Sequence, residues 1–212
     1  NAWRADVIID HTLVENTGKR SYRDVALFFQ DEDNIIGTSF MPYVQNVAGL
    51  SSVNYRAEPD KFREEQGCTL DKMFQPCVVD SPVDPVTPLI EAHAGDSVRI
   101  HVIGANSEQN GMFQVEGHEW PIEPYMPGAD MISVVEFGGS ESLDVFLRQG
   151  AGGPSGIPGD YIWANARLNY QQAGQWGYLR VLPTGDQRIL PLGAGMPSAK
   201  RVESLTEPHV LP

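Results

Sequence analysis

The stretch that decides the fold runs from Pro158 to Leu182 and reads PGDYIWANARLNYQQAGQWGYLRVL. A Gly-Asp-Tyr run opens a strand at Gly159, and a second apolar strand closes the stretch at its end. Between the strands, residues 167–172 are expected to form one helical turn. The stretch therefore predicts a strand, a connecting loop and a final strand.

The frame of this stretch resembles the C-terminal copper loop of multicopper oxidases, the cupredoxin-type family that includes laccases, large bacterial metal oxidases and ceruloplasmin. In that family Gly-Asp-Tyr opens the strand, and a His-Cys-His run and a further His follow. Ala-Gly, an axial Met and Gly-x-Leu-x-Val then close the loop. The residues that fit this frame are Gly159, Asp160, Tyr161, Ala173, Gly174, Gly177, Leu179 and Val181.

The copper ligands of the family are replaced in this chain. Its His-Cys-His run falls on Ala164, Asn165 and Ala166, its later His on Tyr170, and its axial Met on Gln175 or Trp176. A blue copper centre needs a Cys thiolate and two imidazoles, whereas Ala has no donor atom and amides are hard neutral donors. We therefore expect the loop to keep its shape without copper, any copper lying in partner domains or chains. The alternative is chance similarity in a Gly-rich turn.

A second motif, Gly111 to Trp120, resembles the family's His-x-Phe-x-x-His-Gly-His-x-Trp run. The first His of that run falls on Gly111 and the second on Glu116, so only His118 is kept. Side chains alternate along a strand, so Gln114, Glu116 and His118 are expected to share one face. Glu116 and His118 are weak metal candidates, and we favour the alternative of a polar patch at a domain contact.

The resemblance implies an all-β fold, a Greek-key cupredoxin-like β-sandwich. A third point of likeness is the Asn-Tyr-Arg-x-Glu-Pro run that ends at Pro59, similar to one in large bacterial multicopper oxidases. Short strands at regular spacing support a sandwich independently, although they suit an immunoglobulin-like one equally. The expected divisions are an N-terminal extension (1–21), a cupredoxin-like domain (22–185) with an irregular insertion at about 59–88, and a C-terminal arm (186–212).

Local patterns predict further elements along the chain. Strands are expected at residues 7–10 and 22–30, and a short helix behind Pro59 at residues 60–66. Residues 89–93 and 97–103 read as a hairpin around a Gly-Asp turn. Residues 131–137 and 141–147 read as strands joined by a Gly-Gly-Ser turn. His93 and His101 are expected to be ordinary strand histidines that pair with neighbours or water.

Composition excludes several function classes. The chain has 212 residues, with 28 acidic against 15 basic side chains and a formal charge of −13. This balance argues against nucleic-acid binding, which needs a basic surface. No apolar run reaches the roughly 20 residues of a membrane span, so a soluble protein is expected. The first residue is Asn1, with no leader-like segment, which suggests a processed product, a fragment or part of a longer polypeptide.

The two cysteines, Cys68 and Cys77, enclose only eight residues. A disulfide between them implies an oxidising compartment, and two unpaired thiols are the alternative. With the family resemblance, the bridge is favoured, and a periplasmic or extracellular location is expected.

Three functions are compatible with the sequence. The first is a structural or assembly role for a copper-free cupredoxin domain that packs against other cupredoxin domains or chains. The second is membership of an active multicopper oxidase whose coppers lie in other domains or chains. The third is a metal-free small-ligand module built on the aromatic residues Tyr161, Trp163, Tyr170 and Trp176. No hydrolase motif is present, and the isolated chain is expected to have no oxidase activity.

Overall fold

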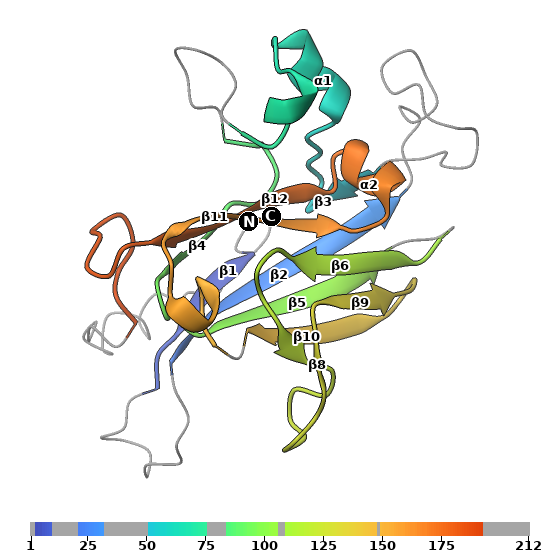
Figure 1. Cartoon of the computed structure of the whole chain (residues 1–212). Coiled ribbons are helices and arrows are strands. Elements are labelled where there is room, and N and C mark those ends of the chain that lie inside the picture. Colours follow the sequence, from blue (N-terminus) through green and yellow to red (C-terminus); the bar gives the residue numbers. More distant parts are fainter. Residues whose placement is uncertain are drawn as a thin grey trace, which may run out of the picture.

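The computed structural model describes residues 3–9, 21–31, 51–75, 84–105, 109–147 and 149–192. Within these residues two five-stranded sheets share one hydrophobic core, which makes the protein a β-sandwich. Figure 1 shows β11 and β12 lying across β1, β2 and β5, with α1 beyond β12. None of the described helices is long and apolar enough to cross a membrane.

The first sheet has the order β1-β2-β5-β10, and β3 pairs with β2. Buried and more exposed side chains alternate along β2 and β5, the pattern of strands with one face on the core. The strands are β1 (Arg4–Val7), β2 (Tyr22–Asp31), β3 (Ser51–Val53), β5 (Val98–Ala105) and β10 (Ser142–Leu147).

The second sheet has the order β4-β12-β11-β6-β9, and β7 and β8 form a separate short pair. The strands are β4 (Ile90–His93), β6 (Gly111–Val115), β7 (Trp120–Pro121), β8 (Met131–Ile132), β9 (Val134–Phe137), β11 (Gly159–Asn165) and β12 (Trp176–Leu182). The helices are α1 (Asp60–Glu65) and α2 (Leu168–Gln172), with 3₁₀ turns η1 (Leu70–Lys72) and η2 (Gly153–Ser155).

The strand connections confirm the predicted all-β fold class. Two parallel pairs, β2 with β5 and β4 with β12, sit among antiparallel neighbours, so the chain crosses repeatedly between the sheets as in a Greek-key cupredoxin-like sandwich. The expected strand at 22–30, the helix at 60–66 and the helical turn at 167–172 are also confirmed. The expected strand at 7–10 lies instead at Arg4–Val7.

The hairpin predicted for residues 89–103 is wrong. Strand β4 pairs with β12 in the second sheet, and β5 pairs with β2 and β10 in the first. The Gly-Asp turn between them therefore joins the two sheets rather than two neighbouring strands. The turn at residues 138–140 likewise links β9 and β10, which belong to different sheets.

The core is centred on aromatic rings from both sheets. The Phe29 ring of β2 lies 5.9 Å from Phe113, 5.0 Å from Phe137 and 6.2 Å from Trp163, measured between ring centroids. Trp163 is fully buried opposite Gly177, where a Cβ atom would lie 2.4 Å from the indole ring. Gly177 therefore leaves room for the largest side chain of the core.

The insertion after β3 covers the outer face of the second sheet. The indole N–H of Trp176 donates to the Glu58 carbonyl oxygen (2.9 Å), and the Arg63 guanidinium lies 5.1 Å from the centre of that indole ring. Arg63 also forms a buried ion pair with the Glu58 carboxylate at 3.0 Å. Cys68, just after α1, is disulfide-bonded. Cys77, the other cysteine of the sequence, lies outside the described residues, so the predicted pairing stays a prediction.

Candidate functional site

The residues at the end of β11 and the start of β12 form a buried amide pair. Asn165 ends β11 and Gln175 precedes β12, and their side chains are 1% and 0% exposed. The Asn165 Nδ2–H donates to Gln175 Oε1 at 2.7 Å, and the Gln175 Nε2–H donates to the Gln30 carbonyl oxygen at 2.8 Å. This pair therefore connects β11, the approach to β12, and β2.

The Asn165 side-chain oxygen is also fully used. It accepts hydrogen bonds from the backbone N–H groups of Met112 (3.0 Å) and Arg167 (3.2 Å). An amide oxygen has two lone pairs. Both lone pairs of Asn165 Oδ1 are occupied, so neither is left for a metal ion. The bond from the Met112 N–H also adds β6 to the strands that the amide pair joins.

Two more positions of the resemblance adjoin this pair. Gly111 opens β6 beside Met112, and a Cβ atom there would lie 2.2 Å from the Phe137 ring. Tyr170 of α2 is 2% exposed, and its carbonyl oxygen accepts the backbone N–H of Gln175 at 2.9 Å. The structure thus brings together Gly111, Asn165, Tyr170 and Gln175, although sixty-odd residues of sequence separate the first from the last.

The two alanine positions of the loop, Ala164 and Ala166, supply no polar side chain. Ala164 is fully buried in the small cluster with Trp176 and Tyr178 on the outer side of the second sheet. The backbone N–H of Ala166 donates to the Met112 carbonyl oxygen. Among the described residues, the donor set at this end of the sandwich consists of amides without a thiolate or an imidazole, and it does not fit a blue copper ion.

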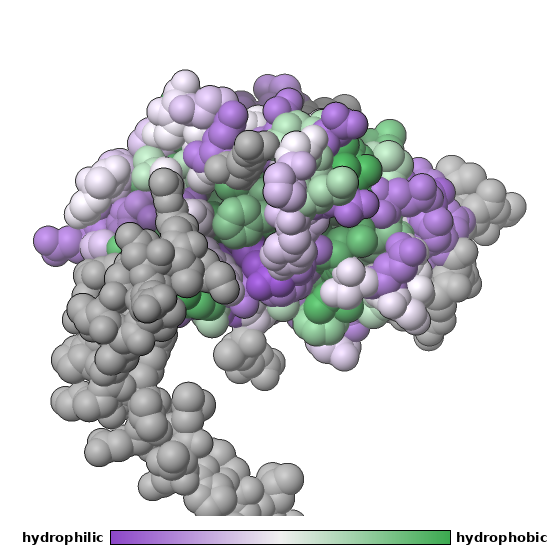
Figure 2. Space-filling view, turned by 90° about the horizontal axis from the view of Figure 1, so that it is seen from below, coloured by the Kyte–Doolittle hydropathy of each residue, from purple (hydrophilic) through white to green (hydrophobic). Residues whose placement is uncertain are grey.

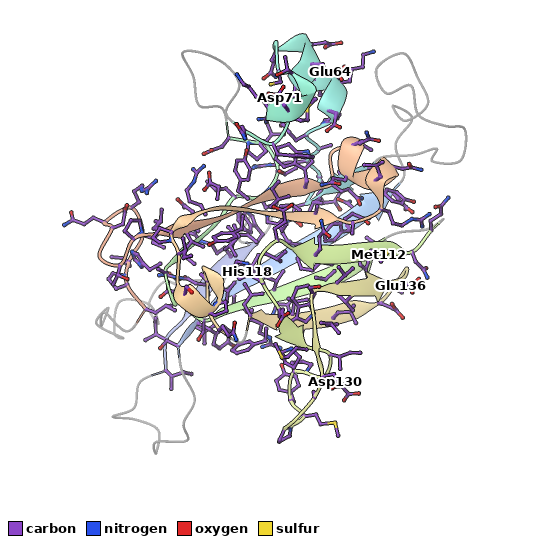
Figure 3. All side chains as sticks on the ribbon, in the orientation of Figure 1. Glu64, Asp71, Met112, His118, Asp130 and Glu136 are labelled. Carbon is purple, nitrogen blue, oxygen red and sulfur yellow. The ribbon has the colours of Figure 1, made fainter. Side chains whose placement is uncertain are left out.

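His118 lies in a different environment from the one predicted. Strand β6 ends at Val115, and Gly117 follows with φ of +66°, so the strand alternation does not continue to His118. The imidazole is 3% exposed while Glu116 is exposed. Figure 3 shows His118 on the connection that follows β6. Gln114, Glu116 and His118 do line one open cavity of about 490 Å³.

Both ring nitrogens of His118 have backbone partners. The Nδ1 atom lies 2.7 Å from the Glu116 carbonyl oxygen, and Nε2 accepts the Gly152 N–H at 3.0 Å. The ring is therefore a neutral tautomer with its proton on Nδ1. Burial lowers the pKa of His118, and the hydrogen bond to the Glu116 carbonyl offsets part of this effect. Since its one lone pair is taken, His118 holds the Gly-rich connection around Gly152 in place.

The part of the chain that the structure describes contains no group of three or more His, Cys, Asp or Glu side chains arranged to hold a metal ion. Three of the four aromatic residues proposed as a ligand cage, Trp163, Tyr170 and Trp176, are buried. The fourth, Tyr161, is partly buried and packs edge-on against the His118 ring at 4.8 Å.

A charged cluster on the outer face of the first sheet was not anticipated. His101 Nε2 lies 2.9 Å from Asp24 Oδ1, and its Nδ1 lies 2.7 Å from Asp144 Oδ1. Burial raises the pKa of the Asp144 carboxyl, but hydrogen bonds from Arg99 and Tyr125 outweigh it and hold the pKa below its usual range. The sequence analysis predicted that His101 pairs with a neighbour. The register of β5 and β10 places Asp144 opposite His101, so knowledge of that register would have identified this neighbour.

Arg23 of β2 is a second feature that the sequence did not indicate. Its guanidinium is 1% exposed and pairs with Asp6 at 2.9 Å and Asp96 at 2.8 Å. It also donates to the Leu190 carbonyl oxygen at 2.7 Å. Several partners satisfy this buried charge, as burial of an ion requires.

Comparison with known proteins finds similar structures but no sequence relative. No family model and no curated protein matches the chain. Among solved structures, the multicopper oxidase mgLAC is 16% identical over 86% of this chain and 51% of its own, with a TM-score of 0.49. A copper nitrite reductase from Nitrosomonas europaea is 14% identical over 77% and 49%, with a TM-score of 0.47.

A multi-copper oxidase from Pediococcus acidilactici is 8% identical over 84% of this chain and 29% of its own, with a TM-score of 0.48. The chain thus spans about half or less of the length of these three proteins. At such low identities and scores, the likeness carries no weight for function, and the fold class rests on the strand order described above.

Proposed function

We propose that this chain is a copper-free cupredoxin-like domain or subunit of a multicopper oxidase-like protein, with a structural or assembly role. The observation that carries the proposal is the buried Asn165–Gln175 amide pair. It occupies the positions where the resemblance would place the Cys thiolate and the axial ligand. In a copper protein of this kind the groups at these two positions bind the metal. Here the two amide side chains hydrogen-bond to each other.

The bonding of the amide pair supports a structural role. A metal centre in a β-sandwich connects strands by taking ligands from several of them. The amide pair connects β11, the approach to β12, β2 and β6 through hydrogen bonds, all of them buried or partly buried. Fully satisfied polar networks of this kind rigidify a protein interior. The network thus stabilises this end of the sandwich without a metal.

Copper elsewhere in the assembly remains compatible with this proposal. Coppers held by other domains or chains would make the chain part of an active oxidase. Copper analysis of the native material and of the isolated chain tests this alternative. The small-ligand module has less support, because Trp163, Tyr170 and Trp176 are buried in the protein interior. The disulfide at Cys68 favours an oxidising compartment, such as the periplasm or the extracellular space.

The test is elemental copper analysis together with a visible absorption spectrum, on the isolated chain and on material purified from its source. Copper in the native material and none in the isolated chain is the expected result for a copper-free partner domain. Near-stoichiometric copper in the isolated chain would overturn the proposal. Copper absent from both samples would favour a purely structural or ligand-binding protein and exclude the active-oxidase alternative.

A further inference from the structure

The loop between β7 and β8 presents apolar side chains to solvent. Ile122 is 58% exposed and Met126 is 61% exposed. Figure 3 shows this loop, with Asp130 labelled on it, projecting from the body of the protein beside β8. Exposed apolar side chains gathered on one projecting segment are typical of an interaction site.

This loop is held in a fixed position on the first sheet. The Tyr125 hydroxyl donates to Asp144 Oδ2 on β10 at 2.8 Å and accepts from the Arg99 guanidinium of β5 at 2.8 Å. Asp144 in turn pairs with His101 on β5. The apolar side chains are therefore displayed by an anchored loop, which lowers the entropic cost of binding.

A groove lies at the opposite edge of the same sheet. It has a volume of about 320 Å³ and is lined by Trp3, Phe28, Tyr55, Arg56 and Pro88, among others. Phe28 is 43% exposed and Tyr55 is 84% exposed. The sheet order β1-β2-β5-β10 places β2, which carries Phe28, toward one edge and β10, which anchors the loop, at the other. In Figure 2 the face seen from below carries hydrophobic residues in several patches between hydrophilic ones.

The backbone that presents Tyr55 is strained. Asn54 and Tyr55 have φ of +53° and +62°, a conformation that a bulky residue adopts rarely. Hydrogen bonds enforce it: the Asn54 side chain accepts from the Phe28 N–H at 2.8 Å, and the Tyr55 N–H donates to Gln30 Oε1 at 2.9 Å. A two-residue hairpin turn accounts for these angles, because Val53 and Arg56 exchange backbone hydrogen bonds of 2.7 and 3.0 Å around Asn54 and Tyr55. The turn displays the Tyr55 ring, which is 84% exposed, at the groove.

The loop carries negative charge and the groove carries positive charge. Residues 119–132 include Glu119, Glu123 and Asp130 and contain no Lys or Arg. Arg56 at the groove is exposed, and no carboxylate of the described residues lies within ion-pair distance of it. Its guanidinium donates one hydrogen bond, 3.4 Å long, to the Val86 carbonyl oxygen. Glu123 likewise forms no ion pair within the described chain.

We propose that the loop of one copy docks in the groove of a second copy, with Ile122 and Met126 against Phe28 and Tyr55, and Glu123 facing Arg56. The contact is head to tail, because the two surfaces lie at opposite edges of the sheet. A heterologous contact of this kind closes into a ring or continues as a chain of copies. The inference goes beyond the proposed function, since it does not depend on whether copper is bound.

The test is sedimentation equilibrium of the whole chain over a wide concentration range, at moderate salt that screens repulsion between copies of formal charge −13. Association to masses that are multiples of 23.3 kDa is expected. Charge reversal in Glu123→Arg or Arg56→Glu is expected to weaken association at least about tenfold, and the double variant is expected to recover most of it. Glu64→Arg on α1, which lines neither the groove nor the loop, is the matched control.

A wild-type chain that stays monomeric at all concentrations would overturn the proposal. So would association that both reversals leave unchanged, or a double variant as weak as either single one. Circular dichroism and thermal melting of every variant separate loss of association from loss of folding. Met126→Ser, an exposed change that keeps the charge, tests the apolar half of the contact and is expected to weaken association as well.

Discussion

Asp60, the first residue of α1, is predicted to destabilise the protein at neutral pH. Its pKa is raised from the ordinary value of 3.8 to about 6, first by burial and then by the nearby Glu64, while Arg63 offsets part of the shift. The Oδ1 atom is buried and has no hydrogen-bond partner among the residues that the structure describes. The charged carboxylate is therefore less well accommodated in the folded state than in the unfolded chain.

The size of the effect follows from the two pKa values. The difference between about 6 and 3.8 corresponds to about 3 kcal/mol, at about 1.4 kcal/mol per pKa unit. The carboxyl is only partly buried, so solvent screening reduces this to about 1–1.5 kcal/mol. A raised folded pKa contributes stability that is present below the unfolded pKa and is lost as the pH rises through about 6.

The variant Asp60→Asn cannot ionise and keeps this stability at neutral pH. We expect its free energy of unfolding to exceed that of the wild type by about 1 kcal/mol at about pH 7.5, and the gain to shrink toward zero near pH 4. Urea unfolding followed by tryptophan fluorescence measures it, because Trp176 packs against this insertion. Glu64→Gln is expected to give part of the same gain.

The matched control is Asp71→Asn in η1, on the same insertion (Figure 3). Asp71 is exposed, and hydrogen bonds from Thr69 and from its own backbone N–H lower the pKa of its carboxyl, so no gain is expected from its substitution. The reasoning is refuted if Asp60→Asn is less stable than the wild type at about pH 7.5. A gain of equal size at every pH would also refute it, because the benefit would then not come from ionisation.

Three further predictions concern the candidate site. The lowered pKa of His118 keeps its ring neutral in the folded state. Its contribution to the free energy of unfolding is therefore complete above about pH 6.5 and is lost as the pH falls below that value. His118→Gln is expected to flatten this part of the pH profile of stability, measured by urea unfolding. Asn165→Leu is expected to cost about 2–3 kcal/mol, because it leaves Gln175 Oε1 without its donor and the Met112 and Arg167 N–H groups without their acceptor; Gln175→Leu in the same chain is expected to recover part of this in a double-mutant cycle. Gly111→Ala is expected to lower the unfolding free energy by about 1–3 kcal/mol, since the new methyl group meets the Phe137 ring; an unchanged melting temperature would contradict that contact.

Elements that depend on local sequence were predictable. The helix behind Pro59 and the strand β2 follow from a cap position and from side-chain alternation, which a single segment contains. The partner of β4 was not predictable in this way, because it is β12, far along the chain, and the Gly-Asp turn is compatible with a hairpin or a crossing between sheets.

The candidate site shows the same division. The resemblance selected Asn165 and Gln175 as replaced ligands, and the sequence contained no signal that their amides bond to each other. That bond requires the loop around α2 to return the chain to the end of β11. The burial of His118 was not predicted, because the sequence pattern does not fix where β6 ends or how the backbone turns at Gly117.

The buried guanidinium of Arg23 has a consequence for the order of folding. Its partners Asp96 and Leu190 lie 73 and 167 residues further along the chain. Contacts between residues so distant in sequence form slowly, since a long loop must close first. During synthesis, the partner Asp6 is made before Arg23, whereas Asp96 and Leu190 follow much later. The set of partners around Arg23 is therefore complete only after the chain has been made through Leu190.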